Sequence, residues 1–444
     1  EKALAAGSAS GEGLGADDAR YFGLENFGNT CYCNSVLQAL LFCAPLRARL
    51  LEYAAEIEAG ERRPKESLLT CLAELAAAIQ ASKKRTGIIA PRKFIHRLRN
   101  DNELFAGYMH QDAHEFINYL LNELAECLEK EEKARRGKVA GGGEGGSEGG
   151  QGGDSGGGDR DGNGEKADEA PKKPKTFIHE LFEGVVSCET RCLQCERITS
   201  RDECFMDLSL EIERDSSLTH CLRSFSKTEL MSGDDKFMCD ACCCYQEAQR
   251  RLRVKVPPRV LCLHLKRFKF VESLGRMKKL AHRVVFPNSV RLPNSDEESE
   301  GAECAYRLFA VVVHIGTGPH HGHYVALVES AGKWLLFDDD AVEVVDEEQL
   351  QAYYGASDEG SARNSEHGYL LFYERAEEPA DAPTSTAPVV SEPFGRARMQ
   401  PNGGFGAGDG ELRGGAGAAA VERGGATAGF ADALTAGFST VGLR

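Results

Sequence analysis

The chain has 444 residues, 41% of them hydrophobic, which is enough to bury one large core or two to three smaller ones. Its formal net charge of −16 argues against a nucleic-acid binder that relies on phosphate contacts. No stretch approaches the roughly 20 apolar residues of a transmembrane helix, and residues 1–20 lack the pattern of a signal peptide. We therefore expect the 16 cysteines in a reducing compartment, cytoplasmic or nuclear, as metal ligands or reactive thiols.

The first part of the chain is predicted to be helical. Residues 1–19 are small and unpatterned, and we expect them to be disordered. The ordered segment that follows extends to about residue 135. Apolar residues recur at helical spacing in three stretches of it: 34–42, 68–79 and 113–128.

The second part of the chain is predicted to form strands. From about residue 137 to residue 175 glycine, serine and acidic residues dominate, which predicts a flexible insertion rather than a domain. Residues 377–444 have a similar bias and are predicted to be a disordered tail. Between them, alternating hydrophobicity predicts strands at 261–270, 306–314, 324–329 and 369–373. Helices followed by strands indicate an α+β fold, with a cleft between the unlike halves as the expected place for a site.

Cys31 stands where the first predicted helix begins, directly after the candidate N-cap Thr30. The positive end of the helix dipole and the free N–H groups there favour a thiolate, and the thiolate is the nucleophilic form of cysteine. A buried structural cysteine is the alternative, because free cysteine is often buried. Cys33 lies deeper in the helix and Cys43 at its far end, so we expect both to pack in the interior.

Asn26 lies shortly before Cys31 and could complete an oxyanion hole. Its side-chain amide could donate to the oxyanion of a tetrahedral intermediate together with the Cys31 backbone N–H. The alternative is an asparagine that only forms a turn. Gly23 and Gly28 would allow the backbone to turn tightly before the helix.

His323 and Asp338 are the candidates for a general base and the group that orients it. His323 opens a predicted strand and follows Gly322, which permits a close approach of the backbone to a ligand. A hairpin that turns at 330–332 would bring Asp338 at the end of the next strand close to His323. This is the geometry that a base and its orienting carboxylate require.

Neighbouring residues compete for both roles. His320 and His321 fall in a predicted loop, where histidines are usually solvated. Asp339 and Asp340 follow Asp338 directly, and a run of three aspartates is often only a solvated loop.

Two C-x2-C pairs predict a metal site. A tetrahedral zinc ion takes four thiolates, and a closed site of this kind stabilises the fold without taking part in catalysis. Cys188, Cys243 and Cys244 are alternative ligands, and unrelated buried thiols are the competing interpretation. The candidate ligands are Cys192, Cys195, Cys239 and Cys242.

Several sequence boxes together resemble the ubiquitin-specific protease family, and they occur in that family's order. The resemblance covers residues 21 to about 374, apart from the glycine-rich insertion, and is strongest to the subgroup of ubiquitin-specific proteases 12 and 46. The boxes are GNTCYCNSVLQAL from Gly28, HQDAHEF from His110, LHLKRF from Leu263, GHYVALV from Gly322 and WLLFDDD from Trp334.

The resemblance implies a papain-like thumb–palm–fingers fold with a zinc-bearing fingers subdomain, over residues 20–376. The thumb would span about 20–135, and the palm about 176–184 and 261–376. The fingers would span about 185–260 and would hold one structural zinc ion on the two C-x2-C pairs.

The resemblance also implies the reaction, a hydrolysis after the C-terminal glycine of ubiquitin through a thioester. Cys31 would be the nucleophile, His323 the base and Asp338 the orienting group. Asn26 would bind the oxyanion, and Asp339 could assist.

The HQDAHEF box would bind the ubiquitin tail. Asp112 and Glu115 would meet arginines of the tail, and Gln111 and His114 would contribute further contacts. The alternative for the two acids is a favourable interaction with the helix dipole, and both roles can hold together. His110 departs from the glutamine usual in the family, which puts one substrate hydrogen bond in doubt.

The subgroup resemblance further implies activation by a WD40-repeat adaptor that docks on the fingers. Ubiquitin and ubiquitinated proteins would be the other partners, with no nucleic acid and no membrane. A ubiquitin-binding scaffold with weak or lost catalysis is the alternative function.

Overall fold

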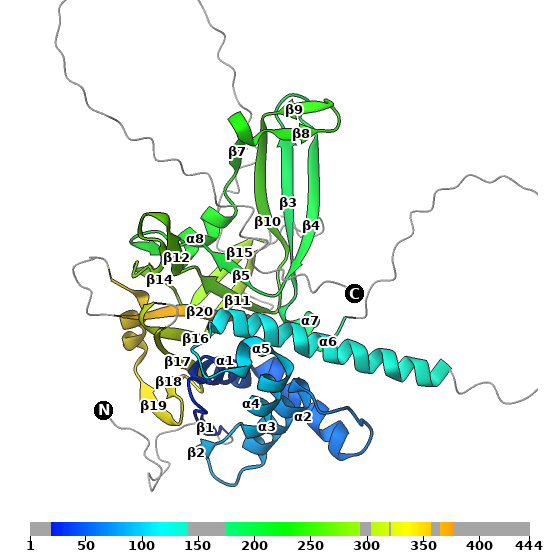
Figure 1. Ribbon diagram of the computed structural model, residues 1–444, viewed down its shortest axis with the longest axis vertical. Coiled ribbons are helices and arrows are strands. Elements are labelled where there is room, and N and C mark those ends of the chain that lie inside the picture. The colour runs from blue at the N-terminus through cyan, green and yellow to red at the C-terminus, as the bar shows by residue number, and fades with distance from the viewer. Residues whose placement is uncertain (1–18, 141–174, 294–302, 319–320, 357–364, 377–444) are drawn as a thin grey trace, which may run out of the picture. The chain divides into compact units, whose positions relative to one another are not determined.

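The computed structural model describes residues 19–140, 175–293, 303–318, 321–356 and 365–376 (Figure 1). Helices dominate the first part and strands the second, so the predicted α+β fold is confirmed. The predicted disordered N-terminus, most of the predicted insertion and the predicted tail lie outside the described residues.

The helical region contains the three predicted helices. Ser67 caps the helix that begins at Leu68. Its hydroxyl accepts from the Thr70 N–H, and the Thr70 hydroxyl accepts from the Ser67 N–H. The last long helix continues to Ala140, so the predicted insertion begins later than residue 137. A short parallel pair, β1 (Tyr21–Leu24) and β2 (Thr86–Ile89), accompanies the helices. The helices are α1 (Cys31–Phe42), α2 (Ala44–Glu58), α3 (Leu68–Ala81), α4 (Arg92–Asp101), α5 (Glu103–Ala106), α6 (Ala113–Ala140) and α7 (Phe177–Phe182).

Helix α1 is the centre of this region. All its residues from Cys31 to Leu41 are buried, including the polar Asn34, Ser35 and Gln38, so the helix is enclosed on every side. It lies against α6 and against strands β16 and β17 of the central sheet. The start of α1 is thereby held at a fixed place relative to the strand that carries His323.

The central sheet has the strand order β19-β18-β17-β16-β20-β11-β5, with β15 paired to β16. All its neighbours are antiparallel except β11 and β5. The predicted strands at 306–314, 324–329 and 369–373 are confirmed. Its strands are β5 (Leu208–Leu210), β11 (Val260–Leu265), β15 (Ser289–Pro293), β16 (Glu303–Gly318), β17 (His321–Ser330), β18 (Lys333–Asp338), β19 (Ala341–Val345) and β20 (Glu366–Arg375).

The predicted strand 261–270 is wrong as one element. The chain forms β11, turns, and starts β12 (Phe268–Val271), which pairs with β13 (Arg276–Lys279). The cause is Arg267, whose side chain is 0% exposed and donates to the carbonyls of Gly368, Leu280 and His282. A guanidinium buried among carbonyls draws the backbone out of the strand alternation that the hydrophobic pattern suggested.

A separate antiparallel sheet with the order β4-β3-β10-β7 extends away from the helices (Figure 1). A short hairpin of β8 and β9 sits at its far end. We call this sheet and hairpin the fingers. Their strands are β3 (Gly184–Cys192), β4 (Ile198–Phe205), β7 (Glu229–Met231), β8 (Phe237–Cys239), β9 (Cys244–Gln246) and β10 (Ala248–Val256).

Short elements lie between the strands listed above. They are β6 (Ser216–Ser217), α8 (Leu218–Phe225), β14 (Val284–Val285) and three 3-10 turns, η2 (Gly233–Asp235), η3 (Glu272–Leu274) and η4 (Glu347–Tyr354). None of the helices in the described part of the chain combines the length and the apolar character needed to cross a bilayer.

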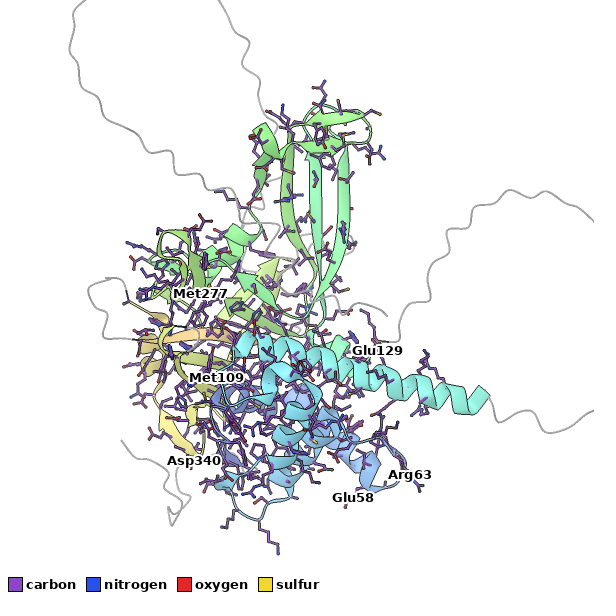
Figure 2. The ribbon with its side chains drawn as sticks, viewed as in Figure 1. Glu58, Arg63, Met109, Glu129, Met277 and Asp340 are labelled. Carbon is purple, nitrogen blue, oxygen red and sulfur yellow. The ribbon has the colours of Figure 1, made fainter. Side chains whose placement is uncertain are left out.

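The main hydrophobic core lies between the helices and the central sheet, where side chains crowd together in Figure 2. Residues of α1, α3, α6, β16 and β20 contribute to it. Among the described residues, no fingers strand contributes a buried member to this core. The fingers have a small buried set of their own, which includes Val186, Ala248 and Leu252.

Candidate active site

Cys31 is the first residue of α1, with a free thiol and a side chain that is 1% exposed. Thr30 holds the N-cap position but does not cap with its side chain. Its hydroxyl instead accepts from the Phe27 N–H at 2.9 Å, which fixes the loop before the helix. The sulfur thus lies at the positive end of the helix dipole. Cys33 and Cys43 are fully buried, as predicted.

His323 and Asp338 are brought together by the hairpin of β17 and β18. The chain reverses at Ala331 and Gly332, both with positive φ, in the tight turn that suits two antiparallel strands. His323 Nε2 then lies 2.6 Å from Asp338 Oδ1. The predicted hairpin and the predicted proximity of the two side chains are confirmed.

The His323 ring bridges a carboxylate and the Cys31 thiol. The hydrogen bond with Asp338 and the one with Cys31 raise the pKa of His323 to about 10, against the opposing effect of burial. The hydrogen bond from His323 in turn lowers the pKa of Asp338. With Nε2 on Asp338, Nδ1 is left to face the sulfur. The raised pKa favours an imidazolium beside the Cys31 sulfur, an arrangement in which a cysteine can act as a nucleophile.

Asn26 is held beside the start of α1 by Asp339. Its Nδ2 donates to Asp339 Oδ2 at 2.7 Å, while its Oδ1 accepts from the N–H groups of Gly28 at 2.9 Å and Thr30 at 3.2 Å. The other Asp339 oxygen accepts from Asn34 Nδ2 at 2.8 Å. Asn26 therefore forms the predicted turn, and its amide is held at a fixed place beside the start of α1.

Asn34 is the one residue of this network that the sequence reading missed. It is 2% exposed within an apolar helix. A buried amide in such a helix needs hydrogen-bond partners. The sequence could therefore predict a polar contact for Asn34, but not that its partner is Asp339.

The aspartate run approaches the loop before Cys31 through its backbone. The Leu24 N–H donates to the Asp339 carbonyl at 2.8 Å. A Cβ on Gly23 would lie 2.2 Å from the carbonyl oxygen of Asp340, which Figure 2 labels, so only glycine fits there. Gly28 supplies the other predicted turn, with φ of +84°.

Of the competing histidines, His321 does not enter this network within the described chain. His321 lies in β17 rather than in a loop, and its side chain is exposed. His320 lies outside the described residues. Within the described chain, His323 is thus the histidine that faces Cys31 and Asp338 together.

Asp112 caps helix α6. Its Oδ1 accepts from the His114 N–H at 2.7 Å, and both its oxygens accept from the Tyr369 hydroxyl, at 2.9 and 2.7 Å. The helix-dipole interpretation therefore holds, while Glu115 on the same face is exposed. Gln111 Nε2 donates to the Leu104 carbonyl at 2.8 Å.

His114 faces the interior, which differs from the predicted substrate contact. Its Nε2 lies 2.7 Å from Asp207 Oδ2, and its ring stacks on His264 with centroids 3.7 Å apart. Burial opposes the charged form, yet the hydrogen bond and charge of Asp207 leave the pKa of His114 raised. The sequence placed His114 on the correct helix but could not show that a distant carboxylate would turn it inward.

The predicted metal ligands gather at the far end of the fingers. Their sulfur atoms all lie within 4.8 Å of one another. The Cys192–Cys242 and Cys195–Cys239 sulfur pairs are 3.9 and 3.6 Å apart. Tetrahedral zinc with bonds of about 2.3 Å separates its sulfurs by about 3.8 Å, so the cluster fits such an ion. The four cysteines are close enough to hold a metal.

The alternative cysteine ligands lie outside this cluster. The Cys243 thiol donates to the Asp240 carbonyl and the Cys244 thiol to the Cys242 carbonyl. Cys188 lies on β3, paired with Leu252 of β10.

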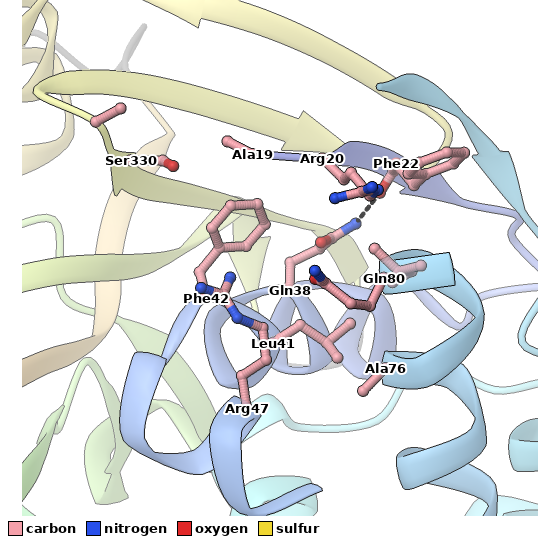
Figure 3. A pocket seen from close by; sticks show the side chains of 12 residues that line it. Ala19, Arg20, Phe22, Gln38, Leu41, Phe42, Arg47, Ala76, Gln80 and Ser330 are labelled. Carbon is pink, nitrogen blue, oxygen red and sulfur yellow. Dashed lines mark hydrogen bonds between the residues drawn. The ribbon is translucent and has the colours of Figure 1, made fainter. Parts of the chain in front are cut away.

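A cavity of about 490 Å³ lies beside the second half of α1 and is lined by Gln38, Leu41 and Phe42, among others (Figure 3). Gln38 Nε2 donates to the Phe22 carbonyl at 2.8 Å across it. Neither Cys31 nor His323 lines this cavity, so it is distinct from the reactive site.

Residues 22–373 match the family described as ubiquitin carboxyl-terminal hydrolase. The chain belongs to this family. Ubiquitin carboxyl-terminal hydrolase 4 of Arabidopsis thaliana is 52% identical over 374 residues, covering 83% of this chain and 98% of that protein. Ubiquitin carboxyl-terminal hydrolase 12 of Salmo salar is 49% identical over 356 residues, covering 80% and 89%. The chain is a cysteine-type deubiquitinase, as the boxes around Cys31 and His323 predicted.

Solved structures share the fold. The SAGA Ubp8/Sgf11/Sus1/Sgf73 DUB module bound to ubiquitin aldehyde matches with a TM-score of 0.59 and 24% identity, over 82% of this chain and 71% of that chain. A structure of the module bound to monoubiquitin matches with a TM-score of 0.60 and 23% identity, over 82% and 71%. The predicted thumb–palm–fingers fold is confirmed.

Proposed function

We propose that this deubiquitinase hydrolyses the isopeptide or peptide bond after the C-terminal glycine of ubiquitin through a thioester on Cys31. The observation that carries the proposal is the His323 ring, which lies 2.6 Å from Asp338 and whose pKa is raised to about 10 by Asp338 and by Cys31. An imidazolium held in this way keeps the neighbouring sulfur anionic and has a proton to give to a leaving group.

The reaction would proceed in two stages. The Cys31 thiolate attacks the glycine carbonyl carbon, and His323 protonates the leaving amine as the C–N bond breaks. Water then attacks the thioester, with His323 taking its proton, and the thiolate leaves. The Asn26 amide and the Cys31 N–H would bind the oxyanion in both stages. Asp339 assists by fixing Asn26, to which it is bonded at 2.7 Å.

The HQDAHEF segment would bind the arginine-bearing tail of ubiquitin. Glu115 is the exposed carboxylate of the two, whereas Asp112 caps α6 and accepts from the Tyr369 hydroxyl. Gln111 would add a polar contact beside them. The Glu115→Gln variant should raise KM for a ubiquitin substrate more than it lowers kcat.

One structural zinc ion would occupy the cysteine cluster of the fingers. Cys192, Cys195, Cys239 and Cys242 supply the soft, closed thiolate set that zinc takes in structural sites. Such an ion would stabilise the fingers and take no part in the chemistry at Cys31.

A WD40-repeat adaptor would dock on the fingers and raise the turnover rate. Apolar side chains there are unusually exposed, with Leu230 61%, Tyr245 68% and Met238 46% exposed, as expected of a surface that a partner covers. If saturating adaptor leaves kcat unchanged, this part of the proposal is wrong.

The protein would work in the cytoplasm, the nucleus or both, since its cysteines are all free in the structure. Fractionation of cells that express the chain would test this.

The decisive experiment compares wild type and Cys31→Ala on a fluorogenic amide of the ubiquitin C-terminus. We expect Cys31→Ala to be inactive, and a ubiquitin C-terminal electrophile to label Cys31 of the wild type. Cys33→Ala is the matched control and should remain active. Equal slow hydrolysis by wild type and Cys31→Ala would instead support a ubiquitin-binding scaffold.

A further inference from the structure

Lys279, at the end of β13, is an ammonium enclosed in the protein. Its residue is 7% exposed, and its Nζ donates to the carbonyls of His314 at 2.8 Å, Gly316 at 2.9 Å and Ser365 at 2.8 Å. An ammonium has three N–H donors, so all of them are used. Burial lowers the pKa of Lys279 to about 7. Enclosing the charged group costs free energy, and a methionine of similar length would not have this cost.

The first two carbonyls lie on either side of the residue that pairs with the base. His314 and Gly316 flank Ile315 in β16, and Ile315 is the direct cross-strand partner of His323 in β17. The register of the two strands shifts just beyond this pair. The regular ladder therefore ends at His323, and the Lys279 ammonium supplies bonds at the place where the ladder stops.

The third carbonyl ties the same point to another strand. Ser365 precedes β20, and its carbonyl accepts both from Lys279 and from the Gly316 N–H at 3.1 Å. On the other side the backbone is crowded, because a Cβ on Gly322 would lie 2.4 Å from the Ile315 carbonyl oxygen. The backbone opposite His323 is thus enclosed from two sides.

We propose that Lys279 is a positioning residue for catalysis, which holds the Ile315 backbone so that the paired His323 ring points at Cys31 and Asp338. This inference rests on the proposed roles of Cys31 and His323. Small displacements of a catalytic group cost large factors in rate, so loss of the three bonds should act on kcat.

The test replaces the ammonium and keeps the length, with Lys279→Met. Lys278→Met is the matched control, because Lys278 is the exposed neighbour on the same strand. Both are assayed with the fluorogenic ubiquitin amide, and kcat is expressed per folded molecule from a thermal melt. We expect Lys279→Met to lower kcat about tenfold or more with KM changed less than about threefold, and Lys278→Met to match wild type.

A second readout reports on the base directly. Iodoacetamide alkylates Cys31, so the rate of inactivation reports on the contact between this thiol and His323. At pH 6, where Lys279 is charged in the wild type, the rate in Lys279→Met should fall below that of wild type. Lys279→Gln, which keeps N–H donors but has a shorter reach, should lie between the two and replaces Lys279→Met if that variant does not fold.

The outcomes separate the two proposals. If Cys31→Ala is inactive but the position 279 variants keep wild-type kcat and the wild-type alkylation profile, the Lys279 inference is wrong and the proposed function stands. A kcat loss fully explained by the folded fraction also overturns the inference. If Cys31→Ala keeps activity, the proposed function itself fails.

Discussion

The helical region around Cys31 and the fingers are stabilised in opposite ways. Helix α1 is buried along almost its whole length and belongs to the main hydrophobic core. The fingers strands contribute no buried side chain to that core within the described chain, and β4 is largely exposed. Their far end instead brings four cysteine sulfurs within 4.8 Å of one another.

The difference shows how one chain combines a densely packed helix with an extended sheet that lies apart from the main core. The reactive thiol needs a fixed helix end opposite a fixed hairpin, and a dense core supplies both. The extended sheet of the fingers buries only a few apolar side chains, such as Leu252 and Val254. A metal on its four cysteines would therefore add cross-links that the main core does not supply.

Disruption of the four-cysteine cluster, the proposed zinc site, should have the largest effect, and it should be local. Structural zinc in small domains contributes on the order of 10 kcal/mol, so Cys239→Ser or a zinc chelator should unfold the end of the fingers. Hydrogen exchange should rise in β8, β9 and the adjoining ends of β3 and β10, while α1 stays protected. Cys243→Ser is the control, because this thiol lies outside the cluster. Uniform loss of protection in both regions would contradict the comparison.

Loss of core packing should affect the whole domain. Leu37 in α1 is 0% exposed, and Leu37→Ala should lower the free energy of unfolding by about 3 kcal/mol. The matched change in the fingers, Leu230→Ala at a side chain 61% exposed, should cost less than about 0.5 kcal/mol. Denaturant midpoints measure both, and equal shifts would mean that the fingers are packed as tightly as α1.

The Asp338→Asn variant should damage the chemistry without loosening either region. We expect kcat/KM to fall on the order of 10²-fold, because the imidazolium loses its carboxylate partner. The pKa of His323 is about 10 with Asp338 present, so in the variant the alkaline limb of the pH–rate profile should move to lower pH. Asp340→Asn should keep the wild-type profile. An unshifted limb in Asp338→Asn would show that this carboxylate does not set the charge of His323.

The contact between the helical region and the loop that leaves the fingers should give the smallest effect. His114 of α6 binds Asp207, which lies between β4 and β5. The pKa of His114 is raised in the folded protein. The stability that the His114–Asp207 bond contributes is therefore complete below the unfolded pKa of about 6.5 and is lost as the pH rises through the raised pKa of the folded state. His114→Gln should therefore cost on the order of 1–2 kcal/mol at pH 6 and less at pH 9. Exposed His96 gives the control, His96→Gln, whose unfolding free energy should match wild type at both pH values.

Much of the site could be predicted from local sequence. A cysteine at a helix start, a strand–turn–strand that ends in aspartate and two C-x2-C pairs are short patterns with a direct physical meaning. Each fixes a residue type relative to a helix or strand end within a few positions. These patterns correctly predicted the proximity of His323 and Asp338 and the clustering of the four cysteines.

Long-range polar contacts escaped the sequence. Asp339 binds Asn26 and Asn34, Arg267 interrupts a predicted strand, and His114 turns toward Asp207. Each partner lies far along the chain, and a buried polar side chain reveals that it needs a partner but not which one.

The sequence by itself determined that Cys31 begins a helix and that His323 and Asp338 end up on adjacent strands, because helix starts and tight hairpins are decided by nearby residues. Only the tertiary structure decided that these two pieces face each other. That encounter depends on α1 packing against β17, and on carbonyls from three segments gathering at Lys279 opposite the base. Hydrophobic burial is non-directional, so the apolar pattern showed that α1 would be covered but not by which strand.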